Sequence, residues 1–205
     1  MRGRQAAFEV TSERLRMFRF ISRDEYNAVP WENGRGMTSD ILLLPQGATR
    51  QDFDIRVSVA PITADSAFSL FSGIDRHITL FKGAGLKLDF PSNSLTLRPL
   101  CPSYFDNGEP PFARLIGGPV EVFNVLTRRG QWTARIEILR QNAKVVVGRN
   151  EIGIVFVAEG EWMADGDGDA QRLQNGGTGI ITQSSTITLS ANPPAVAIFA
   201  RLTLA

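Results

Sequence analysis

The polar groups best suited to binding an anion lie in two strand-like segments of this sequence. In the first, Phe53–Ala60, apolar side chains alternate with polar ones, so that Arg56 and Ser58 share one face of a predicted strand. A guanidinium group on such a face can present two parallel N–H donors to a carboxylate. If the face lines the interior, Arg56 is a candidate for binding an organic acid. If it faces water, both side chains are solvated surface groups.

The second segment is the predicted strand Val120–Thr127, which carries Asn124 and leads into Arg128 and Arg129. Asn124 and Arg128 are four residues apart and share a face, whereas Arg129 falls on the other face. This alternation predicts that Asn124 lies deep and that Arg128 lies nearer a rim. We therefore expect Asn124 and Arg128 in the site, and a salt bridge from Arg129 to a loop carboxylate.

Four further candidates lie at turns. Trp31 and Asn33 belong to a glycine-rich turn, where the indole could form one wall of a pocket and the amide could bind a ligand carboxylate. Asp75 and Arg76 directly precede the predicted strand His77–Phe81, and Arg76 could face an anion. Structural roles are the alternative: Trp31 anchoring the turn, Asn33 binding loop backbone, and Asp75 with Arg76 forming a clamp.

The sequence offers little for a metal site. His77 is the single histidine, whereas catalytic zinc, iron and copper sites use two or three. The segment Asp165–Asp169 resembles a calcium loop but lacks the later bidentate glutamate, so a hairpin tip is favoured. Cys101 is the single cysteine, which excludes an internal disulfide and indicates a reducing cytoplasm. We predict no metal and no cofactor.

Short strands must position these groups. Candidate strands are separated by Gly, Pro, Asn and Asp at spacings of roughly eight to twelve residues, which is typical of an all-β sandwich or barrel. Little helix is expected, apart from a short one with Ser22 and Glu25 as a capping box. A step of apolar strand, charged residue and glycine occurs at His77–Gly83 and again at Ile154–Gly160, which favours a duplicated barrel.

Composition excludes some partners. The chain has 205 residues, 43% of them hydrophobic and 21% charged, which is ordinary for a soluble globular protein. Its net charge of +1 provides no field that would attract nucleic acid or an anionic membrane. No apolar run approaches the roughly 20 residues that cross a bilayer. The arginine-rich residues 1–16 are interpreted as a loosely held extension, or alternatively as an added first helix beginning at Ser12.

Three blocks of residues resemble the motifs of a known bacterial family. The blocks are Val29-Pro-Trp-Glu-Asn-Gly-Arg-Gly-Met-Thr-Ser-Asp-Ile41, then Arg56–Ala60 with Phe68–Arg76 and Phe81–Gly83, and finally Leu115–Gly118 with Phe123-Asn-Val-Leu-Thr-Arg-Arg-Gly130. In order and spacing they are similar to the HutD/Ves family, whose members carry Trp-Lys-Asn-Gly-Gly-Gly-x-Thr, Phe-Ser-x-Phe-x-Gly-x-Asp-Arg and Asp-Phe-Asn-Val-Met-x-Arg-Arg-Gly. The resemblance covers about residues 17–130 and is specific, because three separated blocks agree.

The resemblance implies a bicupin, an all-β chain with two cupin-type jelly-roll barrels. We expect an N-terminal extension at residues 1–16, an N-terminal barrel at 17–115 and a C-terminal barrel at 116–205. The sequence departs from the family motifs at Glu32, Arg35 and Val122. The first change reverses a charge and the second adds bulk. The metal-binding His-x-His…Glu…His set of many cupins is absent from the sequence.

For function, the resemblance implies a metal-free protein that binds a small organic acid and modulates histidine utilisation. The implied ligand is of the urocanate, N-formylglutamate or N-formiminoglutamate type. Alternatives are a Ves-like stress-associated role and a metal-independent isomerase or epimerase, for which His77, Asp75 and Glu32 are the nearby candidate bases. A scaffold acting through its surface also stays open, with strand pairing at a sheet edge forming a homodimer.

Overall fold

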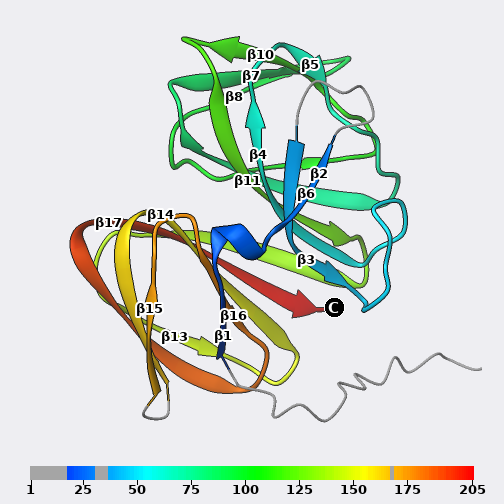
Figure 1. Ribbon diagram of the computed structural model, residues 1–205. Helices are drawn as coiled ribbons and strands as arrows, with labels where there is room; N and C mark the ends of the chain where they lie inside the picture. The colour runs from blue at the N-terminus through cyan, green and yellow to red at the C-terminus, as the bar shows by residue number, and fades with distance from the viewer. Residues whose placement is uncertain (1–17, 31–36, 167–168) are drawn as a thin grey trace, which may run out of the picture.

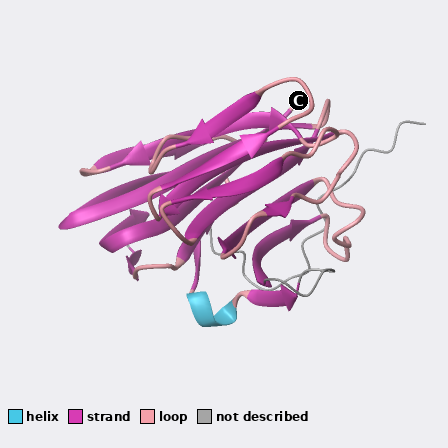
Figure 2. Cartoon of the chain, turned by 90° about the horizontal axis from the view of Figure 1, so that it is seen from above, coloured by secondary structure: helices cyan, strands magenta, loops and turns pink. Residues whose placement is uncertain are grey.

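The computed structural model describes residues 18–30, 37–166 and 169–205 (Figure 1). Nearly all regular elements in these ranges are strands (Figure 2), which confirms the all-β class. The one helix among them is a single 3₁₀ turn, η1 (Arg23–Glu25), where the Glu25 carboxylate accepts a hydrogen bond from the Ser22 backbone N–H at 2.7 Å. No helix in the described ranges is both long and apolar enough to span a bilayer.

The strands form three antiparallel sheets. Their bounds are β1 (Phe18–Ile21), β2 (Asn27–Pro30), β3 (Met37–Leu44), β4 (Ile55–Ile62), β5 (Ser66–Ala67), β6 (Ile74–Lys82), β7 (Gly85–Asp89), β8 (Ser94–Leu97), β9 (Ser103–Asp106), β10 (Phe112–Ile116), β11 (Val120–Arg128), β12 (Trp132–Leu139), β13 (Ala143–Val147), β14 (Glu151–Gly166), β15 (Asp169–Leu173), β16 (Thr178–Ile181) and β17 (Ser185–Leu204). A six-stranded sheet has the order β2-β3-β4-β11-β6-β9, and a four-stranded sheet has the order β5-β10-β7-β8. The seven-stranded sheet follows β1-β16-β14-β17-β12, with β13 also on β17 and β15 also on β14.

The six-stranded and four-stranded sheets share an apolar core between them. Ile78 and Val122 contribute from the six-stranded sheet, and Leu86, Leu88 and Ala113 contribute from the four-stranded sheet. All five are almost completely buried. Period-two alternation produces this arrangement, because each strand sends every second side chain into the same space. We call the side of the six-stranded sheet that carries Ile78 and Val122 its inner face.

The seven-stranded sheet bends around a second core. Its long strands β14 and β17 shift register between Val157 and Glu159 and again between Glu159 and Glu161. Gly160 lies in this irregularity with φ +72°, and a Cβ added there would be 2.2 Å from the carbonyl oxygen of Pro194. Only glycine fits such a close backbone approach. The core inside the bend includes Phe18, Val145, Val155, Trp162, Ile187 and Phe199.

A third core joins the two parts of the chain. The outer face of the six-stranded sheet contributes Ile55, Val57 and Phe123, which pack against Ile154 and Phe156 of the seven-stranded sheet. The rings of Phe123 and Phe156 stack with their centroids 5.0 Å apart. In Figure 1 the two sheets lie against each other at this layer. The six-stranded sheet is therefore covered on both faces, which explains why β4 is buried along nearly its whole length.

Strand pairing divides the chain differently from the expected boundary at residue 115. Strand β11 follows that boundary yet pairs with β4 and β6 in the six-stranded sheet. Strand β1 precedes it by about a hundred residues yet pairs with β16 in the seven-stranded sheet. Periodicity predicts that a segment is a strand but not which strand it pairs with. The placement of β1 in the seven-stranded sheet and of β11 in the six-stranded sheet could therefore not be predicted from the alternation of residues. Among the described residues, none of the three sheets closes into a barrel, which corrects the expectation of closed jelly rolls.

Candidate functional site

Four of the predicted site residues lie together on the inner face of the six-stranded sheet. Strand register places Arg56 of β4 and Arg76 of β6 on either side of Leu126 of β11. One row further along, Ser58 of β4 lies opposite Asn124 of β11. Residues in these rows point to the same face of the sheet. We call Arg56, Ser58, Arg76 and Asn124 the buried polar cluster, because each is at most 8% exposed.

Apolar side chains bound this cluster along the sheet. On one side Phe53 and Ile74 form a small separate apolar group with Leu126, which itself lies between Arg56 and Arg76. On the other side Ile78 and Val122 begin the core shared with the four-stranded sheet. Water is therefore scarce around the cluster, and charges there interact more strongly than charges at the surface. An unpaired charge in such a place is correspondingly costly.

Among the described residues, Asp40 of β3 is the carboxylate that pairs with an arginine of the buried polar cluster. Its Oδ1 accepts a hydrogen bond from Arg56 Nε at 2.8 Å, and its Oδ2 accepts one from Arg50 Nε at 2.9 Å. Burial lowers the pKa of Arg56, and the charge of Asp40 opposes this effect. Asp40 thus holds two guanidinium groups at once, one from β4 and one from the loop before it. A terminal nitrogen of Arg50, Nη2, is buried without a hydrogen-bond partner.

Arg76 has no such counter-charge. Its Nη1 lies 3.5 Å from Asn124 Oδ1, which is a long contact with a neutral amide, and its Nε is buried without a hydrogen-bond partner. Aromatic rings pack against the guanidinium, with Phe68 at 4.9 Å and Phe105 at 5.8 Å from ring centroid to Cζ. Burial, with the nearby charge of Arg56 as a smaller cause, lowers the pKa of Arg76 to about 9. The group is therefore still charged at neutral pH. No carboxylate among the described residues pairs with it.

Two other predicted residues lie away from the cluster. Asp75 alternates with Arg76 and so falls on the outer face, where it accepts a hydrogen bond from Arg129 Nε at 2.9 Å. Arg129 also pairs with Asp106 at 2.8 Å, so its expected salt bridge is formed to carboxylates at the ends of two strands. Asp75 was predicted in the site because it is adjacent to Arg76 in the sequence. Adjacent residues in a strand point to opposite faces, so Asp75 does not share the inner face with Arg76.

Arg128 shares the parity of Asn124 but lies at the end of β11, beyond the apolar group at Leu126. It is fully engaged there: Nε donates to Asp54 at 2.7 Å, and Nη2 donates to Asp52 at 2.7 Å. These contacts hold the segment before β4 against the end of β11. Arg128 is thus a structural clamp in this structure, and its guanidinium is not directed into the buried polar cluster.

Trp31 and Asn33 lie outside the described residues, as does Glu32. His77 falls on the outer face, where its ring lies 5.0 Å from that of Tyr104, and burial lowers its pKa. His77 and Asp75 therefore supply no base to the inner face, which weakens the isomerase alternative. Residues 18–30, 37–166 and 169–205 contain no group of three or more His, Cys, Asp or Glu side chains arranged to hold a metal ion.

Sequence reasoning missed Asp40, Arg50, Phe68 and Phe105. A signal for Asp40 was present, because it is the one charged residue in the predicted strand Ser39–Leu44. A lone carboxylate among four apolar residues and a serine indicates a buried partner of opposite charge. Of the other three, Arg50 and Phe68 come from two different loops and Phe105 comes from another strand. Their approach to the cluster depends on the fold and carries no local pattern.

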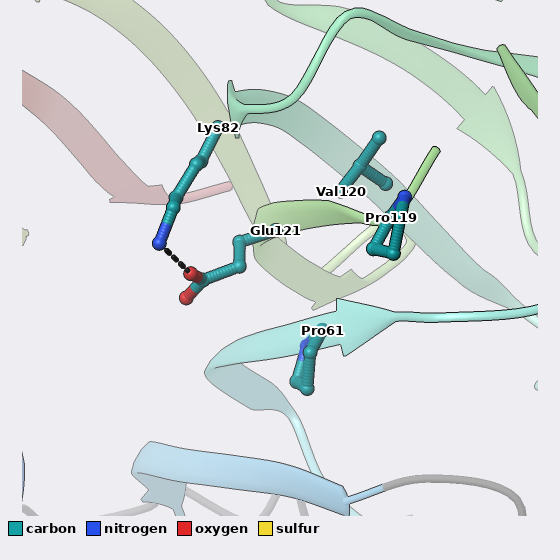
Figure 3. Close-up of a pocket in the computed structure, with 5 residues that line it drawn as sticks. All are labelled: Pro61, Lys82, Pro119, Val120 and Glu121. Atoms are coloured by element: carbon teal, nitrogen blue, oxygen red, sulfur yellow. Dashed lines mark hydrogen bonds and ion pairs between the residues drawn. The ribbon is translucent and has the colours of Figure 1, made fainter. Parts of the chain in front are cut away.

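Two surface hollows lie elsewhere. One of about 170 Å³ is lined by Pro61, Lys82, Pro119, Val120 and Glu121, and Figure 3 shows the Glu121 carboxylate directed at the Lys82 ammonium, 3.0 Å away. Glu121 is also paired with Arg23 at 2.9 Å, so both cations at this hollow already have a carboxylate partner. The second, of about 280 Å³, lies over β14, β15 and β17 and contains the ion pair of Arg172 with Glu161. Neither hollow includes a residue of the buried polar cluster.

The three antiparallel sheets and the polar groups buried inside them define an all-β protein of cupin-like fold. The cupin 2 conserved barrel domain protein from Leptotrichia buccalis superposes with a TM-score of 0.57 at 11% sequence identity, over 91% of this chain and 96% of that chain. At this identity the likeness concerns the fold alone.

The particular family is shown by the sequence itself. The family model described as HutD matches residues 23–199, and the chain belongs to the HutD family, as the three motif blocks predicted. The conserved protein of unknown function PA5104 from Pseudomonas aeruginosa PAO1 has a TM-score of 0.83 and 21% identity, over 91% of this chain and 98% of that chain. HutD from Pseudomonas fluorescens SBW25 has a TM-score of 0.77 and 24% identity, over 92% and 99%.

Proposed function

We propose that this protein is a HutD-like, metal-free protein of cupin-like fold that binds a small organic acid in the buried polar cluster. Arg76 and Asn124 receive the carboxylate, and Asp40 keeps Arg56 in place beside it. The proposed ligand is of the urocanate, N-formylglutamate or N-formiminoglutamate type. Binding would occur in the cytoplasm and would modulate histidine utilisation. Trp31 and Asn33 are retained as the proposed wall and amide of the site.

The single observation that carries this proposal is the burial of the Arg76 guanidinium without a carboxylate partner among the described residues. A buried guanidinium that meets only an amide at 3.5 Å and two aromatic rings has lost its water without gaining a counter-charge. Removing a charge from water costs several kcal/mol unless it is paired. A carboxylate bound here would supply both the missing charge and an acceptor for the unpaired Nε. Carboxylate binding would therefore offset the unfavourable free energy of burying this unpaired charge in the ligand-free fold.

Membership of the HutD family supports the HutD-like part of the proposal. The metal-free part of the proposal rests on the single histidine of the sequence, which cannot form the multi-histidine set of cupin metal enzymes.

Thermal unfolding with and without candidate acids tests this proposal. A ligand at 100 times its Kd stabilises the folded state by about 2.7 kcal/mol. For a chain of this size each kcal/mol raises Tm by roughly 2–4 °C. We expect urocanate, N-formyl-L-glutamate or N-formimino-L-glutamate to raise Tm by at least several degrees, and the corresponding primary amides to leave it unchanged.

Two variants localise the effect. Arg76→Met should abolish the ligand-induced shift, whereas Arg135→Met should retain it, because the Arg135 side chain is 80% exposed on β12. Equal shifts in both variants would place binding outside the buried polar cluster. A flat response of the wild-type protein to all three acids, with a separately validated binding protein as positive control, would contradict the proposed function.

A further inference from the structure

We infer that the edge strand β12 binds a second copy of this chain, whose own β12 pairs antiparallel with it across a two-fold axis at Ile136. The seven-stranded sheets of the two copies then form one continuous sheet. This inference goes beyond the proposed function and does not rest on it. Strand β12 belongs to the seven-stranded sheet, whereas the buried polar cluster lies in the six-stranded sheet.

Strand β12 presents a long and regular edge. It lies at one end of the seven-stranded sheet and pairs on one side only, with β17. It has eight residues, whereas every other strand at a sheet edge in the described ranges has five or fewer. Its register with β17 shows no bulge, and its sequence contains no proline, glycine or lysine. Proteins usually protect a long edge with such features, so this edge is suited to a partner strand.

The backbone groups of every second residue of β12 point to this free edge. The carbonyl oxygen of Gln131 accepts a hydrogen bond from the N–H of Ala205 at 2.8 Å, and therefore points towards β17. Successive residues of a strand point their backbone groups to alternate sides, so those of Ala134, Ile136 and Ile138 point away from β17. No backbone hydrogen bond from a described residue reaches them there. Their donors and acceptors are available to another strand.

Charge complementarity selects the register of that strand. Arg135 and Glu137 share the exposed face of β12, with side chains 80% and 47% exposed and Arg135 Nε 3.5 Å from Glu137 Oε1. In an antiparallel self-pairing centred on Ile136, Arg135 of each copy lies opposite Glu137 of the other. A centre on Arg135 or Glu137 would place like charges directly opposite each other, which is unfavourable. With the centre on Ile136, both charged pairs are of the non-hydrogen-bonded kind, whose side chains are closer.

The other face of β12 is apolar and matches the same register. Ala134, Ile136 and Ile138 pack against the core between the six-stranded and seven-stranded sheets but are only partly buried. With the centre on Ile136, the two Ile136 side chains meet, and Ala134 of each copy lies opposite Ile138 of the other. The pairing therefore covers apolar surface on one face and joins opposite charges on the other. Three hydrogen-bonded residue pairs add about six backbone hydrogen bonds.

Sedimentation equilibrium of the full chain, from about 1 to 200 µM, tests the inference. Pairing of a single strand buries a small interface, so we expect a dimer with a Kd of about 10–100 µM at low salt. Raising NaCl to 0.5 M should weaken the dimer, because exposed ion pairs are screened. A chain that stays monomeric over the whole range at low salt would overturn the inference. Unfolding measured in the low micromolar range concerns the monomer, so Arg135→Met remains a suitable control there.

Charge reversal tests the pairing itself. Arg135→Glu and Glu137→Arg each replace two attractions by two repulsions, so each should raise the dimer Kd by about tenfold or more. An equimolar mixture of the two variants should form a heterodimer with about the wild-type affinity, because every charged pair across the interface again has opposite signs. Lys144→Glu, at an exposed position of β13, is the matched control and should leave Kd unchanged. A dimer that neither reversal weakens, or a mixture of folded variants that associates no better than its components, would overturn the inference.

Disulfide trapping determines the position of the two-fold axis. The exposed Cys101 is first replaced by serine. In that background Ile136→Cys should crosslink two copies under mild oxidation, because the Cα atoms of a hydrogen-bonded antiparallel pair are about 5.5 Å apart. Thr133→Cys should not crosslink, because its two copies would be offset by about six residues, roughly 20 Å. Equal yields in the two variants, or a higher yield for Thr133→Cys, would overturn the axis at Ile136.

Discussion

The guanidinium of Arg76 lies against the ring of Phe68, 4.9 Å from its centroid. Phe68 belongs to the loop between β5 and β6, and this loop is held by Asn107, whose side-chain amide donates to the carbonyl oxygen of Ser69 at 2.8 Å. Loop and sheet thus enclose a charged group that lacks a counter-ion among the described residues.

Replacing Arg76 by methionine should stabilise the ligand-free protein while removing its ligand response. An apolar side chain of similar length would avoid the cost of burying an unpaired charge, so we expect the free energy of unfolding to rise by about 1–3 kcal/mol. Urea denaturation at pH 7 measures this change, with Arg135→Met as the exposed control. A loss of stability greater than about 1 kcal/mol would show that the charge is satisfied in the folded protein.

Asn124→Asp should act as a built-in counter-ion for Arg76. The substitution is nearly isosteric and places a carboxylate where the amide oxygen now lies, 3.5 Å from Arg76 Nη1. We expect the ligand-free protein to gain about 1–2 kcal/mol and the affinity for carboxylates to fall by about tenfold or more. The exposed Asn150→Asp is the matched control. Unchanged affinity would mean that Arg76 and Asn124 do not receive the ligand.

Asp40→Asn should destabilise the fold strongly. Arg56 would then be a second buried guanidinium without a carboxylate, and removing one partner of a buried pair costs about 3–5 kcal/mol. The change at Asp52→Asn should stay within about 1 kcal/mol, because the Asp52 side chain is 89% exposed in its pair with Arg128. Urea midpoints compare the two variants. Similar small losses in both would argue that Asp40 is well hydrated.

The single histidine provides a pH-dependent prediction. Burial lowers the pKa of His77, and Asp75 only partly opposes this. Because the unfolded chain then binds more protons than the folded one, stability should fall as pH decreases from about 6.5 through the lower folded pKa. One-dimensional NMR of the imidazole protons reports this pKa directly, and His77→Gln should lose less stability than wild type between pH 7 and pH 5. A pKa at or above 6.5 would contradict the prediction.

Gly160 should tolerate alanine far less well than Gly47. Both have positive φ, so both variants carry a backbone penalty of about 1–2 kcal/mol. At Gly47 a Cβ meets open space, whereas at Gly160 it would lie 2.2 Å from the carbonyl oxygen of Pro194. We expect Gly160→Ala to cost about 1–3 kcal/mol more than Gly47→Ala by urea denaturation. Equal costs would mean that the bend of the seven-stranded sheet adjusts freely.

Much of the local structure could be predicted from residue patterns. Alternation in Phe53–Ala60 and in β11 assigned Arg56, Ser58 and Asn124 to single faces, and the spacing of turns indicated an all-β fold with little helix. The same rule, applied strictly, separates Asp75 from Arg76, although their adjacency in the sequence suggested a joint role. These inferences succeed because side-chain direction in a strand has a period of two, and this period depends only on the local backbone.

Partner choice was decided by the tertiary structure. Only the fold brings Arg76 of β6 beside the row of Arg56, places Asp40 between Arg56 and Arg50, and engages Arg128 with Asp52 and Asp54. The pairing of β1 in the seven-stranded sheet and of β11 in the six-stranded sheet is likewise decided by the tertiary structure. Contacts between residues far apart in the chain depend on which sheets pack together, and packing depends on total shape and buried area rather than on any short pattern. Residue type and periodicity therefore specify which groups can bind an anion, and the assembled sheets determine which of them lack a counter-charge.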